Sequence, residues 1–367
     1  MRHEDVEPES VSAALARRLR QALSDAGGWL PFDRFMSLAL YEPGLGYYAN
    51  ASRKFGAMPS SGSDFVTAPE LSPLFGQALA AQVAQALDAC GGDELWEFGA
   101  GSGALAGQLL QALGERVRRY TIVDLSGVLR ARQRERLAGW GERVQWADAL
   151  PARMHGVVVG NEVLDAMPVK LLQWDGSSWR ERGVAAASGG FAWEDRPTAL
   201  KPPVEGPFAP GTVTEIHPQA EAFIATVAER LQCGAAFFID YGFPEAEYYH
   251  PQRSGGTLMC HRAHRADTDP LAELGLKDIT AHVNFTGIAL AGQESGLEVL
   301  GYTSQGRFLI NCGLVPLMAQ ADLAAQAAAQ KLVHEHEMGE LFKAIGFAKG
   351  CRFDAIGFAT GDRSGRL

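Results

Sequence analysis

The feature that most constrains the fold of this chain is an alternation of short apolar runs with amphipathic segments, beginning near residue 94. A short apolar run predicts a buried strand, and apolar residues at helical spacing predict a helix. Strand, helix and strand in repetition are typical of a parallel α/β sheet with helices on both faces, which binds its ligands at the carboxyl ends of the strands. The apolar runs are residues 94–101, 120–126, 143–149, 155–163 and 235–242.

Two further regions are predicted outside this alternation. Residues 1–91 read as an N-terminal helical and loop segment that covers the active site, and residues 92–367 as the sheet domain. Insertions at 169–214 and 243–296 each follow the end of a strand, so we expect them to help wall the site. The first insertion carries an Asp-Gly turn and a Gly-Gly pair, which predict short antiparallel strands. Residues 321–345 are predicted to be helical from propensity.

Charge and cysteine content exclude several classes of protein. The chain has 33 basic and 43 acidic residues, a net charge of −10, so it repels phosphate backbones and suits a cationic substrate better than nucleic acid. Its 5 cysteines contain no C-x-x-C pair, which favours reduced thiols and a reducing compartment. The acidic N-terminus and the absence of an apolar run of ~20 residues predict a cytoplasmic protein without a membrane partner.

A glycine-rich turn follows the first apolar run. Residues 97–104 read Glu-Phe-Gly-Ala-Gly-Ser-Gly-Ala, in which glycines let the backbone approach a ligand at the start of the next helix. Gly99, Gly101 and Ala104 also satisfy the dinucleotide fingerprint, so a NAD-dependent oxidoreductase is one alternative. A purely structural turn is another.

Acidic and amide side chains lie at the ends of successive predicted strands. They help to distinguish a dinucleotide site from other ligand sites at the glycine turn. They are Glu97, Asp124, Asp148 and the pair Asn161-Glu162. S-adenosylmethionine fits this pattern, because its ribose hydroxyls need a carboxylate, its adenine amine needs an acceptor, and its amino and sulfonium groups need an anionic surround. A dinucleotide would instead need phosphate cradling. Taken singly, each carboxylate could also cap the following helix.

Six segments give the chain a resemblance to a known family. They are GSDFVTAPELSPLFG at 62–76, EFGAGSGAL at 97–105, NEVLDAMPV at 161–169, FIDYG at 238–242, DITAHVNF at 278–285 and TSQGRFLINCG at 303–313. In order and number these segments resemble the MidA-like methyltransferases, the family that includes the mitochondrial arginine methyltransferase assisting respiratory complex I assembly. The resemblance implies a class I methyltransferase fold, with a Rossmann-like, mostly parallel sheet of seven strands.

The resemblance also implies a pocket for S-adenosyl-L-methionine. The cofactor-binding residues that it implies are Glu97, Gly99, Ala100, Gly101, Gly103, Asp124, Leu125, Asp148, Ala149 and Asn161. Two positions depart from the family pattern: Ser102 stands where the family often has Arg, and Met167 where it has Leu. We also predict that the loop at 62–70 folds back to bring Thr67 and Glu70 to the cofactor; alternatively, these two residues act only as local caps.

The predicted reaction is methyl transfer to a protein arginine. A guanidinium stays protonated, so a carboxylate must hold two of its nitrogens while the third attacks. Glu162 and Asp165 are the expected catalytic residues because they would share a face if their turn were helical, and Asp240 comes next. Glu162 could instead be a cofactor ligand. Tyr41, Tyr47 and Tyr48 could form an aromatic wall for a cation or serve as packing anchors.

The expected partner is a protein that presents an arginine, with a respiratory complex I subunit as one candidate and a homodimer as a further association. A non-catalytic assembly factor that binds S-adenosylmethionine as a structural ligand is the alternative from another class. Cys260, His261 and His264 lie close in sequence, but no fourth ligand is evident at a suitable spacing. We therefore predict no metal site, and expect His264 to be a contact residue.

Overall fold

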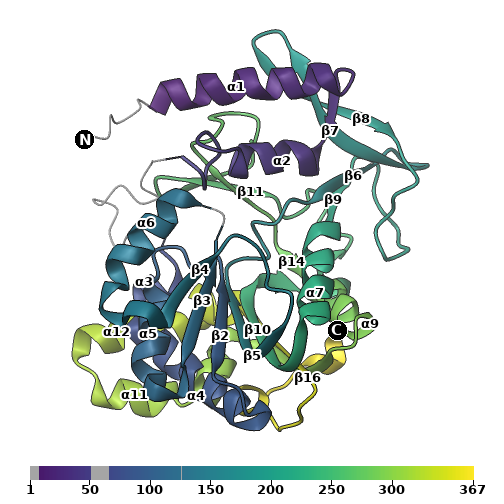
Figure 1. Cartoon of the computed structure of the whole chain (residues 1–367). Coiled ribbons are helices and arrows are strands. Elements are labelled where there is room, and N and C mark those ends of the chain that lie inside the picture. The colour runs from purple at the N-terminus through teal and green to yellow at the C-terminus, as the bar shows by residue number, and fades with distance from the viewer. Residues whose placement is uncertain (1–7, 51–65, 125) are drawn as a thin grey trace. The chain divides into compact units, whose positions relative to one another are not determined.

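The computed structural model describes residues 8–50, 66–124 and 126–367 (Figure 1). The chain divides into two compact units. Unit 1 comprises Met1–Phe65, Asp165–Ala220 and Glu245–His282, and unit 2 comprises Val66–Leu164, Glu221–Pro244 and Val283–Leu367.

Unit 2 is built on a mostly parallel sheet with the strand order β15-β16-β10-β5-β2-β3-β4, and the short β14 pairs with β10. Strands β4, β3, β2, β5 and β10 are parallel, whereas β16 is antiparallel to both β10 and β15. The predicted seven strands lie on the main path, and β14 is an eighth. The bounds are β2 Glu94–Phe98, β3 Arg119–Val123, β4 Val144–Ala147, β5 Met154–Asn161, β10 Leu231–Phe243, β14 Val283–Asn284, β15 Glu298–Ser304 and β16 Phe342–Lys349.

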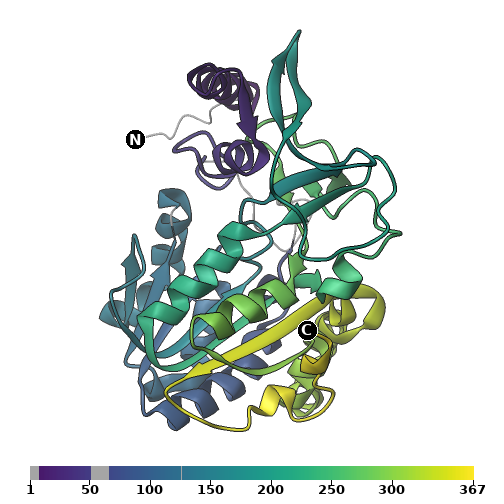
Figure 2. The same ribbon diagram turned by 90° about the vertical axis from the view of Figure 1, so that its right-hand side faces the viewer.

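Helices cover both faces of this sheet. Figure 2 shows α7 and α9 on one face, where Phe223 of α7 packs edge-on against Phe98 of β2. On the other face, buried side chains of α4, α5, α10 and α12 join one apolar core with the strands. The helices are α3 Ala68–Leu71, α4 Pro73–Cys90, α5 Ala104–Leu113, α6 Gly127–Arg136, α7 Pro218–Arg230, α9 Phe285–Glu294, α10 Gln305–Asn311, α11 Leu314–Gln320 and α12 Leu323–Val333.

Unit 1 has its own core beneath an antiparallel sheet in which β1, β7, β6 and β9 follow one another and β8 pairs with β7. The predicted Asp-Gly turn is confirmed: the Asp175 carboxylate accepts hydrogen bonds from the backbone N–H groups of Ser177 and Ser178. The bounds are α1 Pro8–Asp25, β1 Trp29–Pro31, α2 Phe32–Tyr41, β6 Lys170–Trp174, β7 Trp179–Ala187, β8 Gly190–Pro197, β9 Val213–Ile216, α8 Glu245–Tyr248, β11 Met259–Arg262, β12 Arg265–Asp267 and β13 Asp278–Thr280.

The structure divides the chain differently from the sequence expectation of 1–91 and 92–367. Helix α4 begins at Pro73, with Ser72 accepting a hydrogen bond from Leu74, and its buried face joins the core of unit 2. The first insertion belongs to unit 1, but the second is split, because β14 and α9 belong to unit 2. Instead of two domains joined near residue 91, the chain forms two units, and each unit is assembled from three segments that are far apart in sequence.

The prediction of one continuous helix over residues 321–345 is wrong: α12 ends at Val333, a separate π-helical turn covers Glu335–Gly339, and a strand begins at Phe342. Phe342–Lys349 forms β16, which pairs with β10 on one side and β15 on the other. Seven of its eight residues are buried, so sheet pairing overrides the local preference for a helix. Among the described residues, no helix combines the length and the apolar character that crossing a membrane requires.

Candidate active site

The glycine turn after β2 has the conformation that its sequence predicts. Gly99, Gly101 and Gly103 have φ values of 62°, 53° and 81°, a region that strongly favours glycine. A Cβ added at Gly99 would lie 3.0 Å from Cγ2 of Val163. The Gly103 N–H donates to the Ala100 carbonyl at 2.7 Å, and α5 begins at Ala104. Glycine at position 99 therefore allows both the positive φ and the close approach of Val163, and the turn leads directly into the N-terminus of α5.

Asp124, directly after β3, is held in place by neighbouring donors. Its carboxylate accepts hydrogen bonds from Ser126 N at 2.9 Å and from Gln133 Nε2 at 2.8 Å. Burial raises the pKa of Asp124 above its ordinary value, and these hydrogen bonds oppose that shift. The position fits the predicted role of a carboxylate for ribose hydroxyls. Leu125 lies outside the described residues.

Gln133 was missed by the sequence analysis. It is fully buried on α6, donates to the Gly101 carbonyl at 3.0 Å as well as to Asp124, and accepts from Trp146 Nε1 at 2.9 Å. One amide thereby links the glycine turn, the β3 carboxylate and β4. Only its place in a strongly charged helix, RARQRER, sets it apart in the sequence, and that pattern does not reveal burial.

Asp148 and Ala149 follow β4 and are both exposed, with 93% of the Asp148 side chain accessible. The Asp148 carboxylate forms an ion pair with Arg130 of α6. Arg130 also donates to the carbonyl oxygens of Asp124 and Ala147, at 2.7 and 2.6 Å. Arg130 therefore fixes the two strand ends, and sequence reasoning missed it too.

Glu97 differs from the expectation of an anionic side chain. It is 2% exposed, and Tyr120 of β3 donates its hydroxyl to the Glu97 carboxyl at 2.7 Å. Burial raises the pKa of Glu97 to about 8, while the Tyr120 hydrogen bond lowers it. The neutral form therefore predominates at pH 7, and Glu97 contributes less negative charge than the strand-end pattern implied.

The segment that precedes α4 does fold back onto the glycine turn. Glu70 accepts hydrogen bonds from Ser102 Oγ and from Arg136, and Gln108 donates to the Pro69 carbonyl at 2.7 Å. Thr67 stands at the N-cap of α3 but makes no side-chain cap. Residues 62–65 of the predicted loop lie outside the described residues.

Arg136 lies next to Ser102, the residue that stands where the family often has Arg. Its guanidinium donates to Ser102 Oγ as well as to Glu70, so α6 brings an arginine to the turn where the family often carries one in the turn itself.

Glu162 lies at the end of β5 in a left-handed conformation, with φ of 54°. Its N–H donates to the Ile239 carbonyl at 2.9 Å, and its Oε1 accepts from Asn161 Nδ2 at 2.9 Å and from Ala68 N at 3.4 Å. The helical turn on which the pairing of Glu162 with Asp165 rested is therefore absent. A non-glycine residue in this region is strained and must be held there by its surroundings.

Asp240 provides much of that hold. It is 1% exposed, and its Oδ2 accepts hydrogen bonds from the backbone N–H groups of Val163 at 3.1 Å and Leu164 at 2.9 Å. A carboxylate bound to two backbone donors positions the segment after Glu162. The geometry thus favours a positioning role for Asp240 over the expected catalytic one.

Asp165 belongs to unit 1, where it is 4% exposed beside a group of tyrosines. Tyr48 donates its hydroxyl to the Asp278 carboxylate at 2.9 Å, and its ring stacks on Tyr41 at 5.6 Å. Burial first, and then Asp278, Tyr41 and Asp165, hold the pKa of Tyr48 well above its usual range. The three tyrosines are in contact, since the fully buried Tyr47 packs edge-on against Tyr48.

Of the residues weighed as metal ligands, Cys260 is buried in β11, and burial raises its pKa to about 12. His264 lies in the turn between β11 and β12. In the part of the chain that the structure describes, no group of three or more His, Cys, Asp and Glu side chains is arranged to hold a metal ion.

The strand order, with the antiparallel strand β16 inserted between β10 and β15, and the glycine turn after β2 are those of a class I methyltransferase. Comparisons with known proteins agree. The model of a family described as S-adenosyl-L-methionine-dependent methyltransferases matches residues 78–303, more than half of the chain. The chain belongs to this family, the MidA-like methyltransferases, and is an S-adenosylmethionine-dependent enzyme.

Individual relatives extend the match over the whole chain. A crystal structure from Burkholderia thailandensis with bound S-adenosyl-homocysteine is 52% identical, covers 100% of both chains and superposes with a TM-score of 0.95. The mitochondrial protein arginine methyltransferase NDUFAF7 of Danio rerio is 26% identical over 90% of this chain and 84% of its own. Its Drosophila melanogaster homologue is 26% identical over 82% and 75%. These matches show an S-adenosylmethionine-dependent methyltransferase, and the oxidoreductase alternative is wrong.

Proposed function

We propose that this methyltransferase transfers a methyl group to an arginine side chain of a protein, with Glu162 as the carboxylate that binds the guanidinium. The observation that carries the proposal is the left-handed Glu162 at the end of β5, held by Ile239, Asn161 and the Asp240-bound segment next to the glycine turn. Strained residues that are held in this way cluster at functional sites. The names of the NDUFAF7 relatives support arginine as the acceptor.

The chemistry of the acceptor explains why a fixed carboxylate is needed. A guanidinium remains protonated at neutral pH, and its delocalised charge leaves no nitrogen nucleophilic. A carboxylate that binds two of the nitrogens localises positive charge on them, so that the third can attack the methyl carbon in line. The same carboxylate accepts the proton that the attacking nitrogen releases as the bond forms. The bound cofactor supplies the methyl group on a sulfonium. Holding the attacking nitrogen in line accounts for much of the rate.

We assign the cofactor to the residues around the glycine turn. The backbone at Gly99, Ala100, Gly101 and Gly103 would approach the cofactor, Asp124 would bind the ribose hydroxyls, and Asp148 with Ala149 would border the adenine. Asn161, Thr67 and Glu70 complete this set, with Glu70 acting through Ser102. Asp165 stays in the proposal as a candidate catalytic carboxylate.

The decisive experiment measures transfer of a radiolabelled methyl group to acceptor protein alongside calorimetric binding of S-adenosyl-homocysteine. Glu162→Gln should lower transfer by at least about a hundredfold while cofactor affinity stays within about threefold of wild type. Glu94→Gln is the matched control, because Glu94 begins β2 at the end away from the glycine turn. This variant should retain both methyl transfer and cofactor binding. Unchanged transfer by Glu162→Gln would remove Glu162 from the mechanism, and loss of cofactor binding would make it a cofactor ligand instead.

Three finer points are part of the same proposal. The acceptor we propose is a subunit of a respiratory complex I, in line with the predicted family role. We also propose a reducing compartment such as the cytoplasm. Support comes from the 5 free cysteines, whereas the NDUFAF7 relatives are mitochondrial proteins. A homodimer remains a prediction, which light scattering would test.

A further inference from the structure

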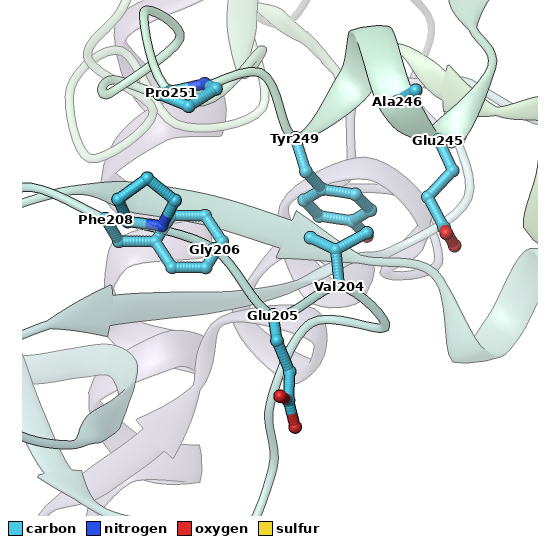
Figure 3. A pocket seen from close by; sticks show the side chains of 9 residues that line it. Val204, Glu205, Gly206, Phe208, Glu245, Ala246, Tyr249 and Pro251 are labelled. Carbon is cyan, nitrogen blue, oxygen red and sulfur yellow. The ribbon is translucent and has the colours of Figure 1, made fainter.

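Unit 1 contains a pocket that the proposed chemistry does not use. It has a volume of about 240 Å³, and all of its lining residues belong to unit 1. Figure 3 shows Tyr249 and Val204 together at its centre, Phe208 to the left and Pro251 above, with the carboxylates of Glu205 and Glu245 reaching out at the lower and right-hand sides. The lining residues are Val204, Glu205, Gly206, Pro207, Phe208, Glu245, Ala246, Tyr249 and Pro251.

Contacts behind the pocket fix its aromatic walls. Tyr249 donates its hydroxyl to the Glu215 carbonyl at 3.0 Å, which leaves its ring as an apolar surface. Phe208 packs edge-on against Trp179, with ring centroids 4.9 Å apart, and Trp179 in turn contacts Trp174 at 5.3 Å. The aromatic rings are therefore held in place before any ligand arrives, which lowers the entropic cost of binding.

The charge of the pocket has one sign. Among the described residues that line it, Glu205, Glu245 and Tyr249 are the ionisable ones, and none is basic. Partial burial raises the pKa of Glu245, a cost that a bound cation would offset. Lys201 approaches Glu205 at 3.9 Å, but both side chains are largely exposed, so this pair is weak and a ligand can replace it.

We propose that this pocket binds an arginine or lysine side chain of the acceptor protein, at a position other than the one that is methylated. Aromatic and proline walls suit the aliphatic stem of such a side chain, and the two carboxylates suit its charged end. The volume lies below the roughly 300–1,000 Å³ of pockets for small molecules, which fits one side chain. The inference rests on the proposed function, since it names how the same enzyme recognises its protein substrate.

The test is a calorimetric titration, at low salt, of a pentapeptide with one central arginine between prolines. It uses the Glu162→Gln background, so that binding at the methylation site is weakened, and a peptide with neutral citrulline as the matched ligand. We expect citrulline to weaken binding about tenfold, and the double variant Glu205→Gln/Glu245→Gln to have a similar effect. Glu247→Gln removes a charge from the same short helix outside the pocket and should leave the affinity unchanged.

A second measurement separates this inference from the proposed function. In the enzyme with Glu162 intact, the double variant should raise KM for the protein acceptor with kcat unchanged. Equal peptide affinity in the pocket variants and the wild type would overturn the pocket assignment even if arginine methylation is found. Conversely, absence of methylation in every protein tested would overturn the proposed function. The pocket assignment would then still stand or fall on the peptide titration alone. Phe208→Ala, checked by circular dichroism for folding, should weaken both peptides.

Discussion

The two units place their buried polar groups in different ways. In unit 2, the buried Glu97 and Asp124 each lie at the end of a parallel strand, so chain order and sheet topology bring them to one edge. In unit 1, buried Glu215 accepts hydrogen bonds from Thr257, Leu258 and Tyr248, which are more than thirty residues away in sequence. In a repeated strand–helix unit, the strand ends fix where polar side chains lie. In a small core built from insertions, each buried polar side chain is placed by its own contacts with residues that are distant in sequence.

The largest effect that would test this comparison is expected for Glu215→Ala. Glu215 is fully buried, and its loss would leave the Thr257 and Leu258 N–H groups and the Tyr248 hydroxyl without this acceptor. We expect unfolding free energy to fall by about 3–5 kcal/mol. Hydrogen exchange should show lost protection in residues 165–220 and 245–282, with the sheet of unit 2 still protected. Uniform loss across both units would mean that they unfold as one, and the comparison would fail.

Asp240→Ala is the counterpart within unit 2. It removes the acceptor for the Val163 and Leu164 N–H groups, so we expect a loss of about 3 kcal/mol in denaturant unfolding. Methyl transfer should also fall, because the segment that positions Glu162 loosens. Asp240→Asn keeps one oxygen acceptor and should recover part of both. If Asp240→Ala were as stable as wild type, the positioning role would be disproved.

The pKa of Glu97 predicts a pH dependence that belongs to unit 2. Its folded value of about 8 lies above the ordinary value of 4.5, so the folded state binds the extra proton between these two values. The stability that this proton contributes is complete below pH 4.5 and is lost as the pH rises through about 8, at a slope of at most ~1.4 kcal/mol per pH unit.

Thermal unfolding measured from pH 5 to pH 9 checks this, with Glu97→Gln as the comparison. The variant should show a flatter profile than the wild type over that range. A wild-type profile that rises with pH, with the same rise in Glu97→Gln, would show that Glu97 is ionised in the fold.

The smallest effect concerns the anchoring of the glycine turn. Arg136→Ala removes the guanidinium that donates to Ser102 and Glu70. Because Arg136 is half exposed, we expect the binding free energy of S-adenosyl-homocysteine to weaken by only about 0.5–1 kcal/mol. That corresponds to a roughly two- to fivefold weaker affinity for S-adenosyl-homocysteine, measured by calorimetry. Adding Ser102→Arg should restore the affinity. If the double variant binds no better than Arg136→Ala alone, the two positions are not equivalent.

Much of unit 2 could be predicted, because its information is local. The apolar runs identified five parallel strands, Ser72 and Gly91 mark the ends of α4, and the glycine turn has the positive φ values that its sequence requires. Strand β16 could not be found in this way, since its helical propensity is overruled by pairing with β10 and β15. Arg130, Gln133 and Tyr120 were missed because a sequence shows neither burial nor which distant group a side chain meets.

The sequence by itself determined the class of the protein. The periodicity predicts a parallel α/β sheet, the glycine turn and the strand-end acids favour S-adenosylmethionine, and the resemblance of six segments to the MidA-like methyltransferases implies a class I methyltransferase. Each of these signals depends on neighbours along the chain. Only the tertiary structure decided the surroundings of each acid. Burial makes Glu97 mostly neutral at pH 7, Asp240 accepts hydrogen bonds from two backbone N–H groups, and Glu162 has a left-handed backbone in place of the expected helical turn. These outcomes depend on desolvation and on contacts between distant segments, which the order of residues does not state.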